Sequence, residues 1–210
     1  RKELIASLRH AHNKRLPRSK GKDRRGQIPN MLSIHVRPPE IEDRQFPGHW
    51  EGDLIKGEGN ASAVGTLVER TSRLVMLVKL PEFKPASATN VLQAFTDKLL
   101  GIAQPMRLSM TYDQGREMSM HKKLSEQTGI AVYFCDPHSP WQRGSNENMN
   151  GLVRQYLPKG TDLSIYSQEQ LDAIADEINN RPRKGLGVRS PLAVYRELLI
   201  NSPQHSTLIH

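Results

Sequence analysis

Cysteine and long apolar runs are what this sequence lacks most. Because Cys135 is the one cysteine among 210 residues, no internal disulfide can form, which is typical of a reducing cytoplasm. No apolar run approaches the roughly 18 residues of a transmembrane helix, and no signal-peptide pattern is present, so we expect no membrane contact. One cysteine with scattered histidines also lacks the paired spacing of a zinc site. We therefore expect a polar cytoplasmic protein of one domain, with or without an appendage.

Positive charge is distributed unevenly along the chain. Residues 1–25 hold ten lysines and arginines but two acids, and this surplus equals the net charge of +8 of the whole chain. A basic arm on a neutral body is the arrangement expected for attachment to DNA phosphates, with a solubilising tail as the alternative. The expected phosphate contacts in this arm are Lys14, Arg15, Arg18, Lys20, Arg24 and Arg25. The chain starts at Arg1 rather than at methionine, and we expect it to be part of a longer protein.

The periodicity of apolar residues predicts an α/β domain. Alternation bounded by turn residues predicts five strands, at residues 49–56, 62–69, 73–80, 107–113 and 130–134. Apolar residues spaced three and four apart predict helices at 87–103, 118–128 and 142–156. Capping residues predict two more helices, which start after Ser167 and Ser190. This order of elements favours a five-stranded mixed sheet flanked by helices on both faces.

Three carboxylates occupy positions from which a site could form. Asp53 lies within the first predicted strand and Asp113 at the carboxyl end of the fourth, so the two converge if these strands are neighbours. Glu147 follows a rigid proline-rich loop and shares a helix face with Arg143 and Arg154. Carboxylate oxygens brought together favour Mg²⁺ or Mn²⁺. Each acid also has a plainer interpretation, as the end of a strand, a turn residue or part of a solvated helix face.

Residues near these acids leave further alternatives open. Glu51 and Glu117 are rival carboxylates, and Glu51, on the same strand face as Asp53, is expected to lie behind the metal ligands or in solvent. Trp141 is expected to anchor its loop by packing, with stacking on a base as the alternative. Tyr156 as the nucleophile of a covalent recombinase is disfavoured, because it belongs to the apolar stripe of its helix.

Four blocks of sequence carry a family resemblance. Three of them resemble the blocks around the first, second and third catalytic carboxylates of insertion-sequence-thirty family transposases: GHWEGDLIKG at 48–57, TYDQGREM at 111–118 and PHSPWQRGSNENMNGLVRQYLPKGTDLS at 137–164. The fourth, NNRPRKGLG at 179–187, is similar to the C-terminal signature of that family. The chain departs from the family at 187–189, where an aromatic residue is common, and near its start, where the helix-turn-helix modules of the family are incomplete.

The resemblance implies a fold and a reaction. It implies a ribonuclease-H-like catalytic domain over residues 31–200, preceded by the basic arm or linker at 1–30 and followed by a tail at 201–210. It implies a DDE triad of Asp53, Asp113 and Glu147 that holds two Mg²⁺ or Mn²⁺ ions. In the implied reactions, water cuts the 3′ end of the mobile element, and the freed 3′-hydroxyl then attacks target DNA.

The resemblance also implies the partners of the chain. The expected partner is double-stranded DNA, as transposon ends and as target, handled by a homodimer or larger assembly at the bacterial nucleoid. Beyond the arm, the expected phosphate contacts are Arg143, Arg154, Arg181, Arg183 and Lys184, with a solvated basic loop as the alternative for the last three. The alternative functions are a ribonuclease-H-like nuclease without strand transfer and a non-enzymatic DNA-binding remnant.

Overall fold

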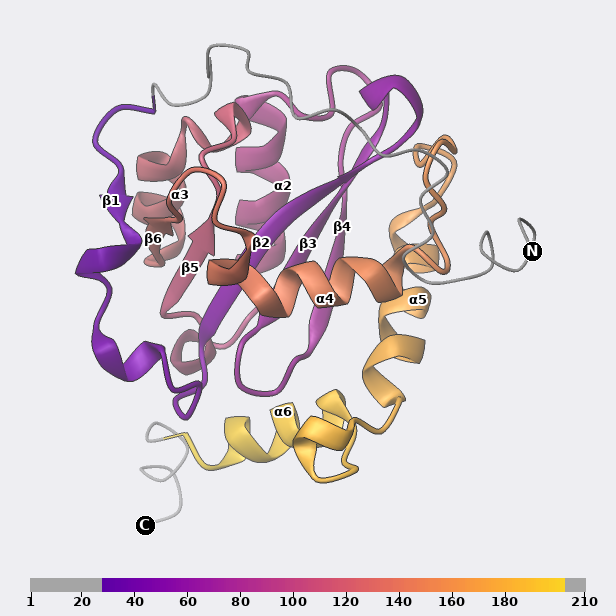
Figure 1. The fold of residues 1–210 in the computed structure, drawn as a ribbon. Coiled ribbons are helices and arrows are strands. Elements are labelled where there is room, and N and C mark those ends of the chain that lie inside the picture. Colours follow the sequence, from indigo (N-terminus) through magenta and orange to yellow (C-terminus); the bar gives the residue numbers. More distant parts are fainter. Residues whose placement is uncertain (1–27, 203–210) are drawn as a thin grey trace.

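The structure, a computed structural model, describes residues 28–202 and is organised around one sheet (Figure 1). Six strands lie in the order β1-β6-β5-β2-β3-β4. They are β1 Leu32–Ser33, β2 His49–Lys56, β3 Ala63–Glu69, β4 Val75–Lys79, β5 Ser109–Tyr112 and β6 Ala131–Phe134. Residues 1–27, which make up most of the predicted arm, and residues 203–210 of the predicted tail lie outside the described residues.

The sheet is mixed, as predicted. β2, β3 and β4 form an antiparallel meander, whereas β2 pairs in parallel with β5, and β5 with β6. Parallel pairing follows from connections through helices, because α2 (Ala88–Leu100) leads to β5 and α3 (His121–Thr128) leads to β6. The prediction of five strands is wrong by one, since β1 joins the edge of the sheet beside β6. Its two residues are too few to show any alternation in the sequence.

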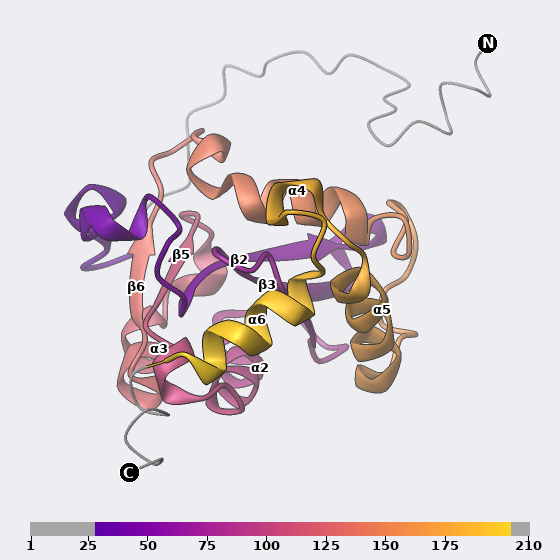
Figure 2. The same ribbon diagram turned by 90° about the horizontal axis from the view of Figure 1, so that it is seen from below.

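Helices cover both faces of the sheet, and Figure 2 shows α4 (Gly144–Val153) on one side with α2 and α3 on the other. One core cluster packs Trp50 and Leu54 of β2 against α2 and α3, and α6 (Pro191–Ile200) joins it. The opposite cluster packs β3 and β4 against α4 and α5 (Gln168–Asn180). Successive residues of a strand point to opposite faces, so Glu51 and Asp53 face α4.

Capping residues start two helices where the sequence predicts them. The side chains of Ser167 and Ser190 accept backbone N–H groups at the starts of α5 and α6, and Ser167 forms a full capping box. The helix predicted at 142–156 is instead divided into a 3-10 turn, η6 (Pro140–Arg143), and α4. Arg143 interrupts the helical path with φ −124° and ψ 40°. Within residues 28–202, no helix has the length and apolar character needed to cross a membrane.

Gly65 of β3 lies where a side chain would collide with the core. A Cβ at this position would lie 2.4 Å from Cε1 of Phe95 and 3.2 Å from Cβ of Val78. We expect Gly65→Ala to lower the free energy of unfolding by about 1–3 kcal/mol, because overpacking displaces well-packed neighbours. Urea denaturation followed by circular dichroism measures the change.

Gly144→Ala is the matched control for this substitution. No atom lies within 4 Å of the Cβ position at Gly144, and α4 gains a better helix former there. We expect this variant to raise the free energy of unfolding by about 0.5–1 kcal/mol. Equal effects of the two substitutions would contradict the assigned packing of β3 against α2.

Candidate active site

The parallel pairing of β2 and β5 brings two of the predicted carboxylates together. Glu51 of β2 pairs with Thr111 of β5. Asp53 and Asp113 each follow two residues further along, and side chains two residues apart on a strand share a face. The two strands are therefore the neighbours that the sequence analysis required, and they place Asp53 beside Asp113.

Arg143 links these two carboxylates. Its Nη1 lies 3.5 Å from Oδ2 of Asp53, and its Nη2 lies 3.4 Å from Oδ2 of Asp113. Nη1 also donates to the carbonyl of Gly52 at 2.8 Å. Asn150 of α4 donates to Oδ2 of Asp53 at 2.9 Å. The turn before α4, the helix itself and the two strands thus meet around one guanidinium group.

Burial and crowding disfavour the ionised acids at this place. Burial raises the pKa of Asp53; Arg143 opposes this shift, and the nearby charge of Asp113 adds to it. Burial likewise raises the pKa of Glu117, in the 3-10 turn η5 (Arg116–Met118). Lys56 opposes that shift, while Asp113 and Asp53 add to it. A nearby cation therefore favours the ionised forms of Asp53 and Glu117.

The sequence analysis left open whether Glu117 is a rival to the predicted metal ligands. Gly115 lets its carboxylate lie close to that of Asp113. A Cβ at Gly115 would lie 2.6 Å from Oε1 of Glu117 and 2.8 Å from Oδ1 of Asp113. The N–H of Gly115 also donates to Oδ1 of Asp113 at 2.9 Å. A side chain at position 115 would push the two carboxylates apart, which explains why a glycine stands at this position of the TYDQGREM block.

Asp113 and Glu117 line a cleft of about 490 Å³, whose walls also include Lys56, His138 and Arg143. Glu147 lies in the first turn of α4 and is exposed. Within residues 28–202, no three side chains of His, Cys, Asp or Glu lie close enough together to hold a metal ion. The structure thus brings Asp53 and Asp113 together and does not gather Glu147 with them.

The donors at the cleft suit a hard divalent cation. Asp53 and Asp113 both turn a carboxylate oxygen toward the guanidinium group of Arg143, so both can face a single positive charge. These two side chains offer carboxylate oxygens, the hard donors that Mg²⁺ and Mn²⁺ prefer. The residues present therefore fit the metal that the sequence analysis expects.

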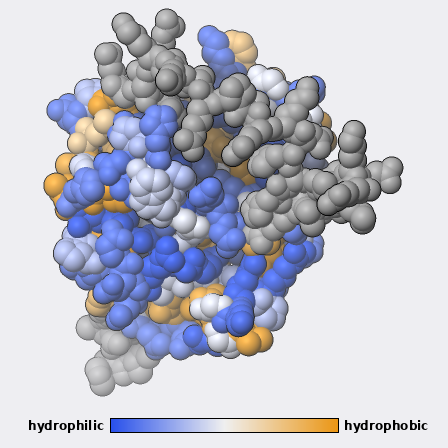
Figure 3. Space-filling model, viewed as in Figure 1, coloured by the Kyte–Doolittle hydropathy of each residue, from blue (hydrophilic) through white to orange (hydrophobic). Residues whose placement is uncertain are grey.

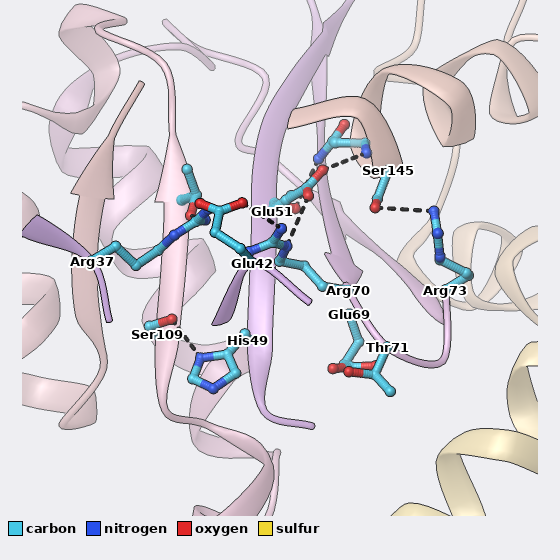
Figure 4. A network of polar contacts seen from close by, with 12 residues as sticks. Arg37, Glu42, His49, Glu51, Glu69, Arg70, Thr71, Arg73, Ser109 and Ser145 are labelled. Carbon is cyan, nitrogen blue, oxygen red and sulfur yellow. Dashed lines mark hydrogen bonds and ion pairs between the residues drawn. The ribbon is translucent and has the colours of Figure 1, made fainter. Parts of the chain in front are cut away.

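A buried carboxylate fixes α4 on the sheet (Figure 4). Glu51 is fully buried and accepts the N–H of Asn146 at 2.8 Å, while the side-chain amide of Asn146 donates to the carbonyl of Glu51 at 2.8 Å. On its other side, Nε of Arg70 lies 3.2 Å from Oε1 of Glu51. The alternative that places Glu51 in solvent is therefore wrong. Glu51 instead holds the start of α4 beneath the candidate site.

Three of the remaining predicted DNA contacts are engaged within the chain. Arg154, Arg181 and Arg183 each bind a carbonyl or carboxylate oxygen, at 2.9, 2.6 and 3.1 Å, so they help to hold helix ends. Lys184 is exposed. The packing expected for Trp141 is wrong, since its side chain is 72% exposed. The predicted contacts in the arm lie outside the described residues: Lys14, Arg15, Arg18, Lys20, Arg24 and Arg25.

Comparison with known proteins identifies relatives along the described chain. Residues 43–140 match the integrase core domain family. The chain is 66% identical over 201 residues to the transposase for insertion sequence element IS1086 of Cupriavidus metallidurans, covering 96% of this chain and 58% of that protein. It is 46% identical over 190 residues to the transposase InsI for insertion sequence element IS30A of Escherichia coli K12, covering 89% and 49%. The chain thus spans about half the length of the curated relatives it matches.

A solved structure shares the fold. The catalytic core domain of BIV integrase superposes with a TM-score of 0.51 at 21% identity, covering 71% of this chain and 94% of that domain. The sheet with helices on both faces is therefore the ribonuclease-H-like fold expected from the sequence. Together, the motifs, the matched core domain and the two transposases show that the chain belongs to the IS30 family of transposases.

Proposed function

We propose that residues 31–200 form a DNA transposase domain that cuts the 3′ ends of its element and joins them to target DNA by in-line phosphoryl transfer. The observation that carries this proposal is the placement of Asp53 in β2, and of Asp113 directly after the parallel strand β5, around one guanidinium group. Two acids that face one cation fit metal-dependent phosphoryl transfer. The family supports the same chemistry, because the relatives are named as transposases.

Asp53, Asp113 and Glu147 would hold Mg²⁺ or Mn²⁺ in a site for two ions. When bound, such ions stabilise the attacking and leaving oxygens of the displacement. The chain itself supplies position and charge. Asn150 orients the carboxylate of Asp53 through a hydrogen bond of 2.9 Å. Arg143 balances the two aspartates and can also bind a phosphate oxygen of the substrate.

The position of Glu147 on α4 supports its role as the third acid. It precedes Asn150 by three residues, and residues three apart are neighbours on a helix surface. Asn150 already contacts Asp53. Because Glu51 fixes the start of α4, Glu147 is carried by an anchored helix rather than by a loop.

DNA is the proposed partner in two roles, as element end and as target, and the handling of two ends favours a homodimer or larger assembly. The basic arm within residues 1–30 would bind phosphates outside the cleft. We place this activity at the nucleoid in the cytoplasm. A nuclease of the same fold would cut without joining, and a DNA-binding remnant would do neither, so the reaction products separate the three functions.

Asp113→Asn and Glu147→Gln should each lower strand cleavage and joining by at least about a hundredfold, the scale on which losing a charge-stabilising group slows a reaction. Labelled element-end DNA incubated with Mg²⁺ or Mn²⁺ is resolved on denaturing gels. Glu126→Gln is the matched control, because Glu126 is likewise an exposed glutamate on a helix, and it should keep full activity. Joining by either site variant at the wild-type rate would refute the triad.

Without metal, Asp53→Asn should raise the Tm at pH 7. The pKa of Asp53 is raised in the fold, so ionisation is less favourable there than in the unfolded chain, and the destabilising effect is present above the folded pKa. Adding Mn²⁺ should raise the Tm of the wild type, since ligand at a hundredfold excess over Kd stabilises by about 2.7 kcal/mol. Differential scanning fluorimetry measures both effects. An Asp53→Asn protein that gains as much from Mn²⁺ as the wild type would remove Asp53 from the metal site.

Deleting residues 1–25 should flatten the salt dependence of DNA binding. Each phosphate that a basic side chain neutralises adds about 0.9 to the slope of log K against log salt concentration. Fluorescence anisotropy of a labelled duplex at several salt concentrations gives this slope. Deleting residues 203–210, which contain no Lys, Arg, Asp or Glu, is the matched control. If the two deletions give the same slope as the full chain, the arm does not contact phosphates.

A further inference from the structure

A second hollow lies beside the cleft. It has a volume of about 440 Å³, and its walls include Arg37, Glu42, Arg44, Arg70 and Trp141. We call it the Trp141 groove. The exposed indole of Trp141 belongs to the 3-10 turn η6, whose residues border both the cleft and this groove. The groove and the candidate active site are therefore separated by one short turn.

Two arginines of the groove have hydrogen-bond donors without acceptors. Arg37 and Arg70 are 6% and 3% exposed. Arg37 donates to Oγ1 of Thr111 at 2.8 Å, but its Nε has no hydrogen-bond partner. Nε of Arg70 lies 3.2 Å from Glu51 without the alignment of a hydrogen bond, and Nη1 of Arg70 also lacks a partner. Buried donors without acceptors are unfavourable, so this pair favours an anion.

Glu42 is the anion that the structure places against this pair. Its carboxylate is 59% exposed, pairs with Arg37 and lies 3.8 Å from Nη2 of Arg70. Figure 4 shows both arginines turned toward it. Positive charge remains after this pairing, because Arg44 also lines the groove. Burial lowers the pKa of His49 to about 4, with Arg70 and Arg37 adding to the shift and Glu40 opposing it.

The arginines of the groove contact the two strands that carry the candidate active site. Thr111 and Glu51, which contact the two arginines, stand two residues before Asp113 and Asp53. Side chains two residues apart on a strand share a face and lie about 7 Å apart. Successive nucleotides of a DNA strand advance by about 3.4 Å along a duplex, so a strand in the cleft reaches the groove within a few nucleotides. Figure 3 shows that hydrophilic residues dominate the described part of the face viewed over α4.

We propose that the Trp141 groove binds one unpaired nucleotide of the DNA strand that occupies the cleft, with its base stacked on Trp141 and its phosphate bound by Arg44 and Arg70. Proteins that bind single strands combine aromatic side chains with positive charge in this way. A free phosphate or an acidic peptide needs the arginines but not the exposed indole. The inference rests on the proposed function for its substrate, and it adds a subsite beside the triad.

The emission of Trp141 provides a direct test. The chain has two tryptophans, and Trp50 is fully buried, so quenching by added DNA reports on Trp141. The full chain, in EDTA, is titrated with a short thymidine oligomer and with an abasic copy that keeps every phosphate. We expect the thymidine oligomer to quench the emission and to bind roughly tenfold more tightly than the abasic copy, because a stacked base contributes on that scale.

Substitutions separate the base contact from the phosphate contact. In anisotropy with labelled oligomers, Trp141→Ala should lose the preference for the thymidine oligomer, and Trp141→Phe should keep most of it. Arg44→Ala should weaken the binding of both oligomers. Glu42→Gln should strengthen the binding of both by roughly severalfold, because a like charge beside the phosphate is removed. Phe83→Ala is the matched control for Trp141→Ala, since Phe83 is 76% exposed outside the groove, and it should change nothing.

Each outcome bears on the inference. Equal affinity of the wild type for both oligomers, or unchanged emission while the thymidine oligomer binds, would overturn it. Competition by inorganic phosphate with no preference between the oligomers would make the groove a phosphate site and would overturn the base contact. Asp113→Asn should keep the preference although it loses cleavage. A preference that persists in a wild-type protein unable to cleave DNA would support the groove and count against the proposed function.

Discussion

The buried carboxylate of Glu51 is the interaction on which the candidate site depends. It accepts the N–H of Asn146 in α4 and lies 3.2 Å from Nε of Arg70, which follows β3. An ionised group removed from solvent is tolerated only when it is paired and hydrogen-bonded, so Glu51 requires both the helix and the β3–β4 connection to be in place. Arg143 and Glu147 stand on either side of Asn146 in the chain and take their positions from this anchor.

Parallel strand pairing supplies the other half of the site. The register of β2 with β5 sets Asp53 beside Asp113, in surroundings where burial already raises the pKa of Asp53. Such an arrangement costs stability, and it is kept where the charges serve a function. A nearby cation therefore favours the ionised form of Asp53. Arg143 supplies that charge in the structure, and a divalent ion would supply it during the proposed reaction.

Much of this architecture was predictable from the sequence, because local patterns determine it. Alternation in β2 put Asp53 on one face, and the strand order allowed it to meet Asp113. The burial of Glu51 was not predictable, since its partner Asn146 lies 95 residues away and alternation does not show what covers a face. The exposure of Trp141 was missed for a related reason. Its proline-rich turn has no periodicity, so a large aromatic residue there is equally compatible with packing and with solvent.

The turn η6 lies between the candidate active site and the Trp141 groove. Its proline-started backbone carries Trp141 on one side and Arg143 on the other, and α4 with Glu147 begins directly after it. A base stacked on Trp141 would contact the same turn that holds Arg143 between the two aspartates, and it could shift that turn. Since a divalent cation at the proposed site would compete with Arg143 for these carboxylates, a displacement of the turn by bound DNA would favour the metal over the guanidinium group. Binding of the strand and assembly of the triad would then be one event, because the same few residues link them.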